Sequence, residues 1–154
     1  MRVLLGLGSN LGNRRQLLAD AVGSLTGVVA VSPLYETAPV GGPAGQGPFL
    51  NLVVEIDSEM SPRELLGVCQ RLEAAAERVR IERWGPRTLD VDILWIDGVT
   101  VNEPDLEIPH PRMWGRRFVM APLADIAPDV APSGWERQVD GEVRQVGTLD
   151  DGSE

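Results

Sequence analysis

A short segment in which apolar and acidic residues alternate constrains the fold most. Its apolar residues are Leu89, Val91 and Ile93, and its acidic residues are Asp90 and Asp92. This alternation is typical of a β-strand with one face in the core and one polar face. At a rise of about 3.3 Å per residue, the two carboxylates begin about 6.6 Å apart on the polar face. Two such carboxylates can converge on a hard divalent cation, which prefers oxygen ligands.

An arginine-rich turn leads directly into this strand. Residues 83–87 read RWGPR, and Arg71, Arg78 and Arg80 precede them in a chain whose net charge is -9. The planar guanidinium group suits the oxygen atoms of phosphates. The turn and the acidic pair together therefore predict a polyphosphate held between metal ions and arginines. The chain contains no lysine, which excludes a P-loop kinase because that motif needs a lysine on the phosphates.

Length and charge narrow the class of protein further. The 154 residues suit a single domain over 1–154, and we expect residues 150–154 to form a frayed tail. The acidic net charge argues against a general nucleic-acid binder. No apolar run reaches the roughly 20 residues that a transmembrane helix needs, and the N-terminus lacks a small-residue cleavage site. Cys69 is the single cysteine, so no internal disulfide forms, and we expect a cytoplasmic protein without a membrane partner.

Hydrophobic periodicity, caps and turns predict the remaining elements. We expect strands at 2–8, 28–35, 49–57 and 89–96, helices at 14–26, 62–79 and 117–125, and a small hairpin at 137–146. Asn13 and Ser61 are the expected N-caps of the first two helices, and Asp97-Gly98 predicts a hairpin turn after the fourth strand. The order of the first six elements is the β-α-β-β-α-β plan of a ferredoxin-like α+β sandwich with an antiparallel sheet. The last helix and the small hairpin are C-terminal additions to that plan.

Four smaller features each leave two interpretations open. The glycines at residues 6, 8 and 12 have the spacing G-x-G-x-x-x-G, which favours a tight turn around residues 8–10 over a dinucleotide fingerprint. The Gly/Pro-rich loop over residues 37–48 is either functional or a connector, and its length favours function. Phe49 and Asn51 share one strand face, where they either bind a flat heterocycle or join the core. His110, between two prolines, is either structural or catalytic.

Residues 83–93, RWGPRTLDVDI, resemble the signature of the 6-hydroxymethyl-7,8-dihydropterin pyrophosphokinase family. Four further segments match that family in the same order along the chain: 8–12, 35–39, 49–51 and 109–111. The resemblance extends over about residues 2–130. It implies a ferredoxin-like enzyme of tetrahydrofolate biosynthesis that transfers pyrophosphate from ATP to the hydroxymethyl group of 6-hydroxymethyl-7,8-dihydropterin and releases AMP.

The resemblance also implies a set of site residues. Asp90 and Asp92 are expected to bind two Mg²⁺ ions that bridge the ATP phosphates. The residues expected to be catalytic are Arg78, Arg80, Arg87, Asp90 and Asp92. The expected ATP-binding residues are Glu73, Arg80, Arg87, Ile93 and His110. The expected pterin-binding residues are Thr37, Val40, Phe49, Asn51, Trp84, Arg116 and Phe118.

Within these sets, the resemblance implies that Phe49 and Phe118 sandwich the pterin ring and that Trp84 lies on a loop that closes over the site. Glu107 stands where some members of the family have a small hydroxyl residue near the adenine. Two alternatives from other classes are a non-catalytic ferredoxin-like nucleotide-binding module and a metal-dependent phosphohydrolase. We expect a monomer whose partners are ATP and the pterin.

Overall fold

The computed structural model describes residues 1–10, 13–37, 49–83, 89–139 and 141–149, with the backbone alone for 77–83. The helices are α1 (Arg14–Gly23), α2 (Pro62–Arg83) and α3 (Arg117–Ile126). The strands are β1 (Arg2–Ser9), β2 (Val28–Val31), β3 (Tyr35–Thr37), β4 (Phe49–Asp57), β5 (Asp90–Ile96), β6 (Val101–Glu103), β7 (Leu106–Ile108) and β8 (Val143–Gln145). Short 3₁₀ helices lie at Met113–Gly115 and Trp135–Arg137.

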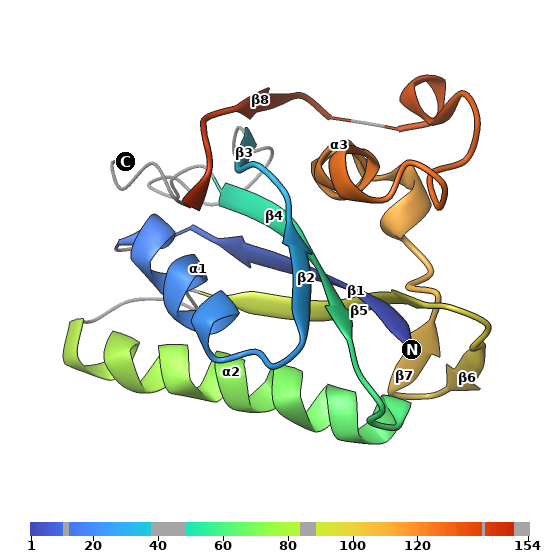
Figure 1. Ribbon diagram of the computed structural model, residues 1–154. Coiled ribbons are helices and arrows are strands. Elements are labelled where there is room, and N and C mark those ends of the chain that lie inside the picture. Colours follow the sequence, from blue (N-terminus) through green and yellow to red (C-terminus); the bar gives the residue numbers. More distant parts are fainter. Residues whose placement is uncertain (11–12, 38–48, 84–88, 140, 150–154) are drawn as a thin grey trace.

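One antiparallel sheet has the strand order β5-β1-β4-β3-β8, and β2 also pairs with β4. The chain reaches this sheet in the order β1-α1-β2/β3-β4-α2-β5, so the predicted ferredoxin-like β-α-β-β-α-β plan is confirmed (Figure 1). The central strand β1 lies between β4 and β5, which are its antiparallel partners along most of its length.

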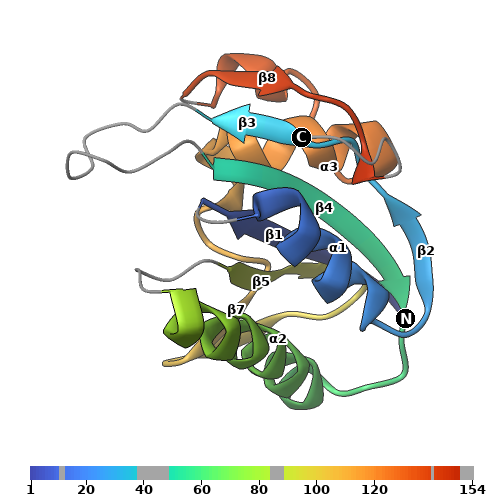
Figure 2. The same ribbon diagram turned by 90° about the vertical axis from the view of Figure 1, so that its left-hand side faces the viewer.

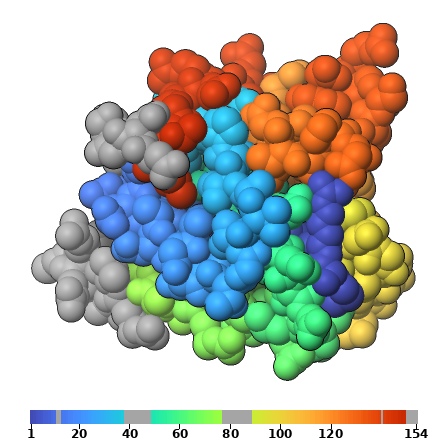
Figure 3. Space-filling view, in the orientation of Figure 1, coloured from blue at the N-terminus to red at the C-terminus, as the bar shows by residue number. Residues whose placement is uncertain are grey.

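Helices cover both faces of the sheet. Helices α1 and α2 pack on one face, and α3 packs on the other (Figures 1 and 2). Side chains of β4 alternate between the two faces, because Leu50 and Leu52 belong to the core under α1 and α2, whereas Val53 belongs to the core under α3. A space-filling view shows α1 and β2 side by side on one surface, with α2 below them (Figure 3).

The predicted helix starts are confirmed by their capping hydrogen bonds. The Asn13 side chain accepts from the Gln16 backbone N–H at 3.2 Å and begins α1. At the start of α2, the Ser61 N–H donates to Glu64 Oε1 at 2.9 Å, and the Glu64 N–H donates to Ser61 Oγ at 3.2 Å. This reciprocal pair is a capping box. Helix α1 ends at Gly23, earlier than predicted, and Gly27 with φ 77° turns the chain toward β2.

Three local predictions need correction. The strand expected over 28–35 is two strands, β2 and β3, separated at Ser32–Leu34, where Pro33 has no N–H to donate to a ladder. The expected hairpin at 137–146 is wrong, because β8 pairs with β3 instead of with its own neighbours. The turn at Asp97-Gly98 exists, but only an isolated bridge from Ile96 to Val99 follows it, and β6 pairs with β7. The helix expected over 117–125 is confirmed as α3.

Candidate functional site

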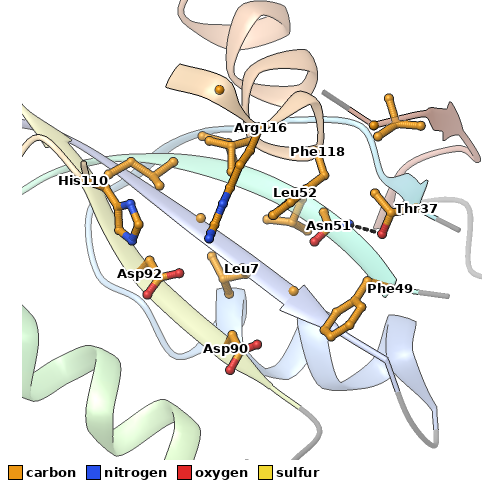
Figure 4. A pocket seen from close by; sticks show the side chains of 18 of the residues that line it. Leu7, Thr37, Phe49, Asn51, Leu52, Asp90, Asp92, His110, Arg116 and Phe118 are labelled. Atoms are coloured by element: carbon orange, nitrogen blue, oxygen red, sulfur yellow. Dashed lines mark hydrogen bonds between the residues drawn. The ribbon is translucent and has the colours of Figure 1, made fainter. Parts of the chain in front are cut away.

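A cavity of about 740 Å³ opens on the α3 side of the sheet. Its wall combines residues of β1, β3, β4, β5, β8 and α3 with the segment that precedes α3 (Figure 4). The predicted site residues that line it are Thr37, Phe49, Asn51, Asp90, Asp92, His110, Arg116 and Phe118. In these eight residues, the structure brings together one set that the family resemblance assigned to ATP and its metal ions and another set that it assigned to the pterin.

Strand register explains why these residues meet. Gly8 on the central strand β1 is paired with Asp90 on one side and with Asn51 on the other. Gly6 is likewise paired with Asp92 and Val53. Cross-strand partners project from the same face of a sheet, so the acidic pair and the β4 residues face the same cavity across two glycines.

The acidic pair lies on β5 as its alternation predicted. Val91 and Ile93 are buried in the core under α1 and α2, whereas Asp90 and Asp92 point into the cavity (Figure 4). Among the residues that the structure describes, no three His, Cys, Asp or Glu side chains gather into a group that could hold a metal ion. Two carboxylates nevertheless fit Mg²⁺, which usually binds one or two protein carboxylates together with substrate phosphates and water.

His110 stands beside the acidic pair with a defined tautomer. Its Nδ1 accepts from the Arg112 backbone N–H at 3.2 Å, so the neutral ring carries its proton on Nε2. Burial lowers the pKa of His110, and the nearby positive charge of Arg116 acts in the same direction, although Asp92 opposes it. The neutral imidazole can therefore donate one hydrogen bond from Nε2 into the cavity.

The opposite end of the cavity suits a flat polar ring. Asn51 is buried, and its Nδ2 donates to Thr37 Oγ1 at 3.3 Å. Phe49 and Phe118 flank this pair (Figure 4), and the Arg116 guanidinium lies 5.5 Å from the centre of the Phe118 ring. Aromatic faces beside a fixed amide and hydroxyl provide stacking together with directed hydrogen bonds.

Other predicted site residues lie away from this cavity or outside the described part of the chain. The Ile93 side chain belongs to the core, so only its backbone can contact ATP. Glu73 Oε2 accepts from the Val91 N–H at 2.8 Å and thus faces the outer side of β5. Val40, Trp84 and Arg87 lie outside the described residues, and Arg78 and Arg80 lie in the part of α2 described by its backbone alone.

Two groups of cavity residues were missed by the sequence reasoning. The tight turn expected around residues 8–10 is wrong, because Gly8 and Ser9 continue β1. Gly6 and Gly8 instead form the floor, and their spacing of two along a strand was the available signal. The second group, Gly141–Val143, comes from the C-terminal segment and had no comparable sequence signal.

Comparisons with known proteins agree with this geometry. A family described as "7,8-dihydro-6-hydroxymethylpterin-pyrophosphokinase (HPPK)" matches residues 4–128. A relative from Methylorubrum extorquens, named 2-amino-4-hydroxy-6-hydroxymethyldihydropteridine pyrophosphokinase, is 46% identical over 138 residues, covering 86% of this chain and 87% of the relative. A relative of the same name from Pseudomonas aeruginosa is 45% identical over 134 residues, covering 84% of this chain and 82% of the relative.

Solved structures support the fold. A crystal structure of wild-type Plasmodium falciparum HPPK-DHPS matches with a TM-score of 0.53 at 16% identity over 82% of this chain and 38% of that chain. A variant of that protein with pterin and p-hydroxybenzoate matches with a TM-score of 0.57 at 14% identity over 97% of this chain and 42% of the other. Separately, no helix in the described part of the chain is long and apolar enough to cross a membrane.

Proposed function

Because the chain belongs to the 7,8-dihydro-6-hydroxymethylpterin-pyrophosphokinase family, we propose that it transfers the terminal pyrophosphoryl group of ATP to the hydroxymethyl group of 6-hydroxymethyl-7,8-dihydropterin. The products are the pterin diphosphate and AMP, in the route to tetrahydrofolate. The observation that carries this proposal is one cavity with an acidic end on β5 and a ring-binding end on β3, β4 and α3. A hydrolase acting on ATP alone has no need of the second end.

The pterin occupies the ring-binding end. Its bicyclic ring stacks between Phe49 and Phe118, and its polar edge takes hydrogen bonds from Asn51 and Thr37, which are already oriented by their mutual bond. Arg116 reaches into the cavity beside the ring and limits its position. Val40 and Trp84 complete this set by family resemblance. Such positioning holds the hydroxymethyl group toward β5.

The ATP phosphates occupy the acidic end. Asp90 and Asp92 line this end and would hold two Mg²⁺ ions, which would supply positive charge against the phosphates. His110 donates from Nε2 to a phosphate oxygen, since its Nδ1 already accepts a backbone N–H. By family resemblance, Arg78, Arg80 and Arg87 contact the phosphates and stabilise the negative charge of the transition state. Glu73 and the Ile93 backbone contact the nucleotide by the same resemblance.

Positioning and charge neutralisation account for the reaction. The hydroxymethyl oxygen forms a bond to the β-phosphorus, while the bond from that phosphorus to the bridging α,β-oxygen breaks, and its electron pair leaves with AMP. The alcohol loses its proton in this step, and Asp90 and Asp92 supply carboxylates at this end of the cavity that can accept it. Holding both substrates in line supplies much of the acceleration.

Incubation of the protein with Mg-ATP and 6-hydroxymethyl-7,8-dihydropterin tests this function. We expect AMP and the pterin diphosphate in equal amounts by liquid chromatography, and neither product when the pterin is omitted. Formation of ADP or phosphate at the same rate with and without the pterin would identify a hydrolase. Binding of ATP and pterin without any AMP would identify a non-catalytic binding module.

A further inference from the structure

The C-terminal segment over residues 141–149, here called the C-terminal strap, crosses the edge of the sheet from one face to the other. It lies outside residues 4–128, which match the family. Among the described strands, its strand β8 pairs only with β3 and so ends the sheet (Figure 2). Val143 lines the cavity on the α3 side, whereas Val146 and Leu149 pack against the core under α1 and α2.

An arginine holds the C-terminal strap at each end. On the α3 side, Arg117 Nε donates to the Gly141 carbonyl at 2.8 Å. On the α1 side, Arg15 Nη1 donates to the Thr148 carbonyl. Its Nη2 donates to the Val146 carbonyl at 3.4 Å. The strap is therefore fastened to two helices that lie on opposite faces of the sheet.

The burial of Arg15 makes the attachment on the α1 side weak. The residue is 9% exposed, and its buried Nε has no hydrogen-bond partner among the described residues. A buried N–H without a partner costs free energy comparable to that of a hydrogen bond. This cost offsets part of what the bonds to the strap contribute. The strap can therefore open locally while the rest of the domain stays folded.

The C-terminal strap supports the strand that carries Thr37. Strand β3 has three residues and lies between β4 and β8. Val143 of the strap is paired with Thr37. Beyond this ladder, the Val146 N–H donates to the Leu34 carbonyl at 2.9 Å, and the Leu34 N–H donates to the Gly147 carbonyl at 2.7 Å. When the strap opens, β3 loses its partners along one of its two edges.

Strand β3 in turn orients the amide of Asn51. Asn51 Nδ2 donates to Thr37 Oγ1 at 3.3 Å and to the Tyr35 carbonyl at 3.5 Å, so both acceptors belong to β3. Both distances are long for an N–H···O bond, and a small displacement of β3 therefore breaks this geometry. An open strap leaves the ring-binding end without a fixed amide.

We propose that docking of the C-terminal strap and binding of the pterin are coupled, so that each favours the other. Arg15 is the positioning residue that holds the docked strap, and it does so from α1, on the face of the sheet opposite α3. The coupling makes the strap a conformational device that stabilises the occupied ring-binding end. The proposal rests on the pyrophosphokinase function, because that function supplies the pterin as the ligand.

Hydrogen exchange of single amides measures strap docking in the full-length protein. The Val146 and Leu34 amides report on the strap, because their hydrogen bonds join it to the residue before β3. The Leu25 amide, which donates to the Val22 carbonyl at 3.1 Å just after α1, is the control. With saturating 6-hydroxymethylpterin, we expect the two strap amides to exchange about fivefold or more slowly. The Leu25 amide should exchange at an unchanged rate.

Arg15→Gln tests the coupling from the other side. The shorter side chain cannot make both bonds to the strap, so the Val146 amide should exchange faster and the Kd for the pterin should rise. The Kd for ATP and the thermal unfolding temperature should change little. The rise in the pterin Kd cannot exceed the factor by which the pterin slows exchange in the wild type, because the coupling is reciprocal.

Two further variants complete the test. Arg15→Lys keeps a cationic donor, so its exchange rates and its pterin Kd should lie between those of the wild type and of Arg15→Gln. Arg137→Gln replaces an exposed arginine outside the strap and outside the cavity lining, and it should change neither the exchange rates nor the pterin Kd.

The outcomes separate this proposal from the function on which it rests. If calorimetry shows that the pterin binds but strap exchange is unchanged, or the Leu25 amide slows equally, the coupling is wrong and the pyrophosphokinase function stands. Faster exchange in Arg15→Gln with a wild-type pterin Kd also overturns the coupling, since the strap then has only a structural role. Wild-type exchange in Arg15→Gln would show that Arg15 does not hold the strap. If the wild type neither binds the pterin nor forms AMP, both proposals fall together.

Discussion

Replacing Gly8 by alanine tests whether the floor of the cavity must be free of side chains. A Cβ atom at residue 8 would lie 2.9 Å from Asn51 Oδ1 and 3.6 Å from Phe49 Cδ1. The contact with Asn51 is shorter than real Cβ atoms tolerate, so the amide of Asn51 must move by a few tenths of an ångström. Its bond to Thr37 Oγ1 is already long at 3.3 Å, and this movement weakens it further.

Gly8→Ala should therefore impair binding and spare folding. One weakened hydrogen bond at the ring, together with a methyl group beneath it, should cost about 1.5–3 kcal/mol of pterin affinity, or roughly 10- to 150-fold in Kd. In folding, Gly8 is part of an extended strand, so alanine reduces the entropy of the unfolded chain by about 0.4–1 kcal/mol. This gain offsets the crowding at Asn51, and the free energy of unfolding should change by less than about 1 kcal/mol.

Titration calorimetry with 6-hydroxymethylpterin and urea unfolding measure the two quantities separately. Gly23→Ala is the matched control, because a Cβ at Gly23 meets nothing within 4 Å and the residue lies outside the cavity lining. It should leave pterin affinity unchanged. Wild-type pterin affinity in Gly8→Ala would refute the assigned floor, and a large loss of stability would show that Gly8 serves packing instead.

Three further changes address the metal site, the ring site and the core. Asp92→Ala should abolish AMP formation while changing the pterin Kd little, and full turnover in this variant would remove Asp92 from the metal site. Phe49→Ala should weaken pterin binding by about 1–3 kcal/mol while ATP affinity stays the same, and calorimetry that shows the reverse would reject stacking. Burial raises the pKa of the Cys69 thiol to about 12, so iodoacetamide at pH 8 should modify Cys69 only after the protein unfolds. Rapid alkylation of the native protein would contradict this.

Local sequence patterns predicted the parts of the structure that depend on neighbours along the chain. The alternation around Asp90 and Asp92 placed one face of β5 in the core and the other in the cavity, as the structure shows. The capping box at Ser61 predicted the start of α2 for the same reason, since its hydrogen bonds span only three residues. These features need no knowledge of distant contacts.

The pairing of β8 could not be predicted in this way. The Asp140-Gly141 sequence is a strong local signal for a hairpin turn, but Thr37 and Tyr35 on β3 offered an unpaired edge about a hundred residues away in sequence. The structure satisfies the β3 edge with Val143–Gln145. The β3 edge needs hydrogen-bond partners, so β8 pairs with β3 and not with a neighbouring strand of a local hairpin, and this pairing brings Val143 to the cavity.

The cavity itself follows from where side chains are missing. Helix α3 packs on β4, and Val119 and Val53 belong to one core whose edge lines the cavity. Strand β1 carries Gly6 and Gly8 on the face that lines the cavity, so no β1 side chain fills the space at these two positions. Because side chains alternate along a strand, a register shift of one residue would turn both glycines inward and both aspartates away. Strand register, more than any single side chain, therefore keeps the acidic end and the ring-binding end in one cavity.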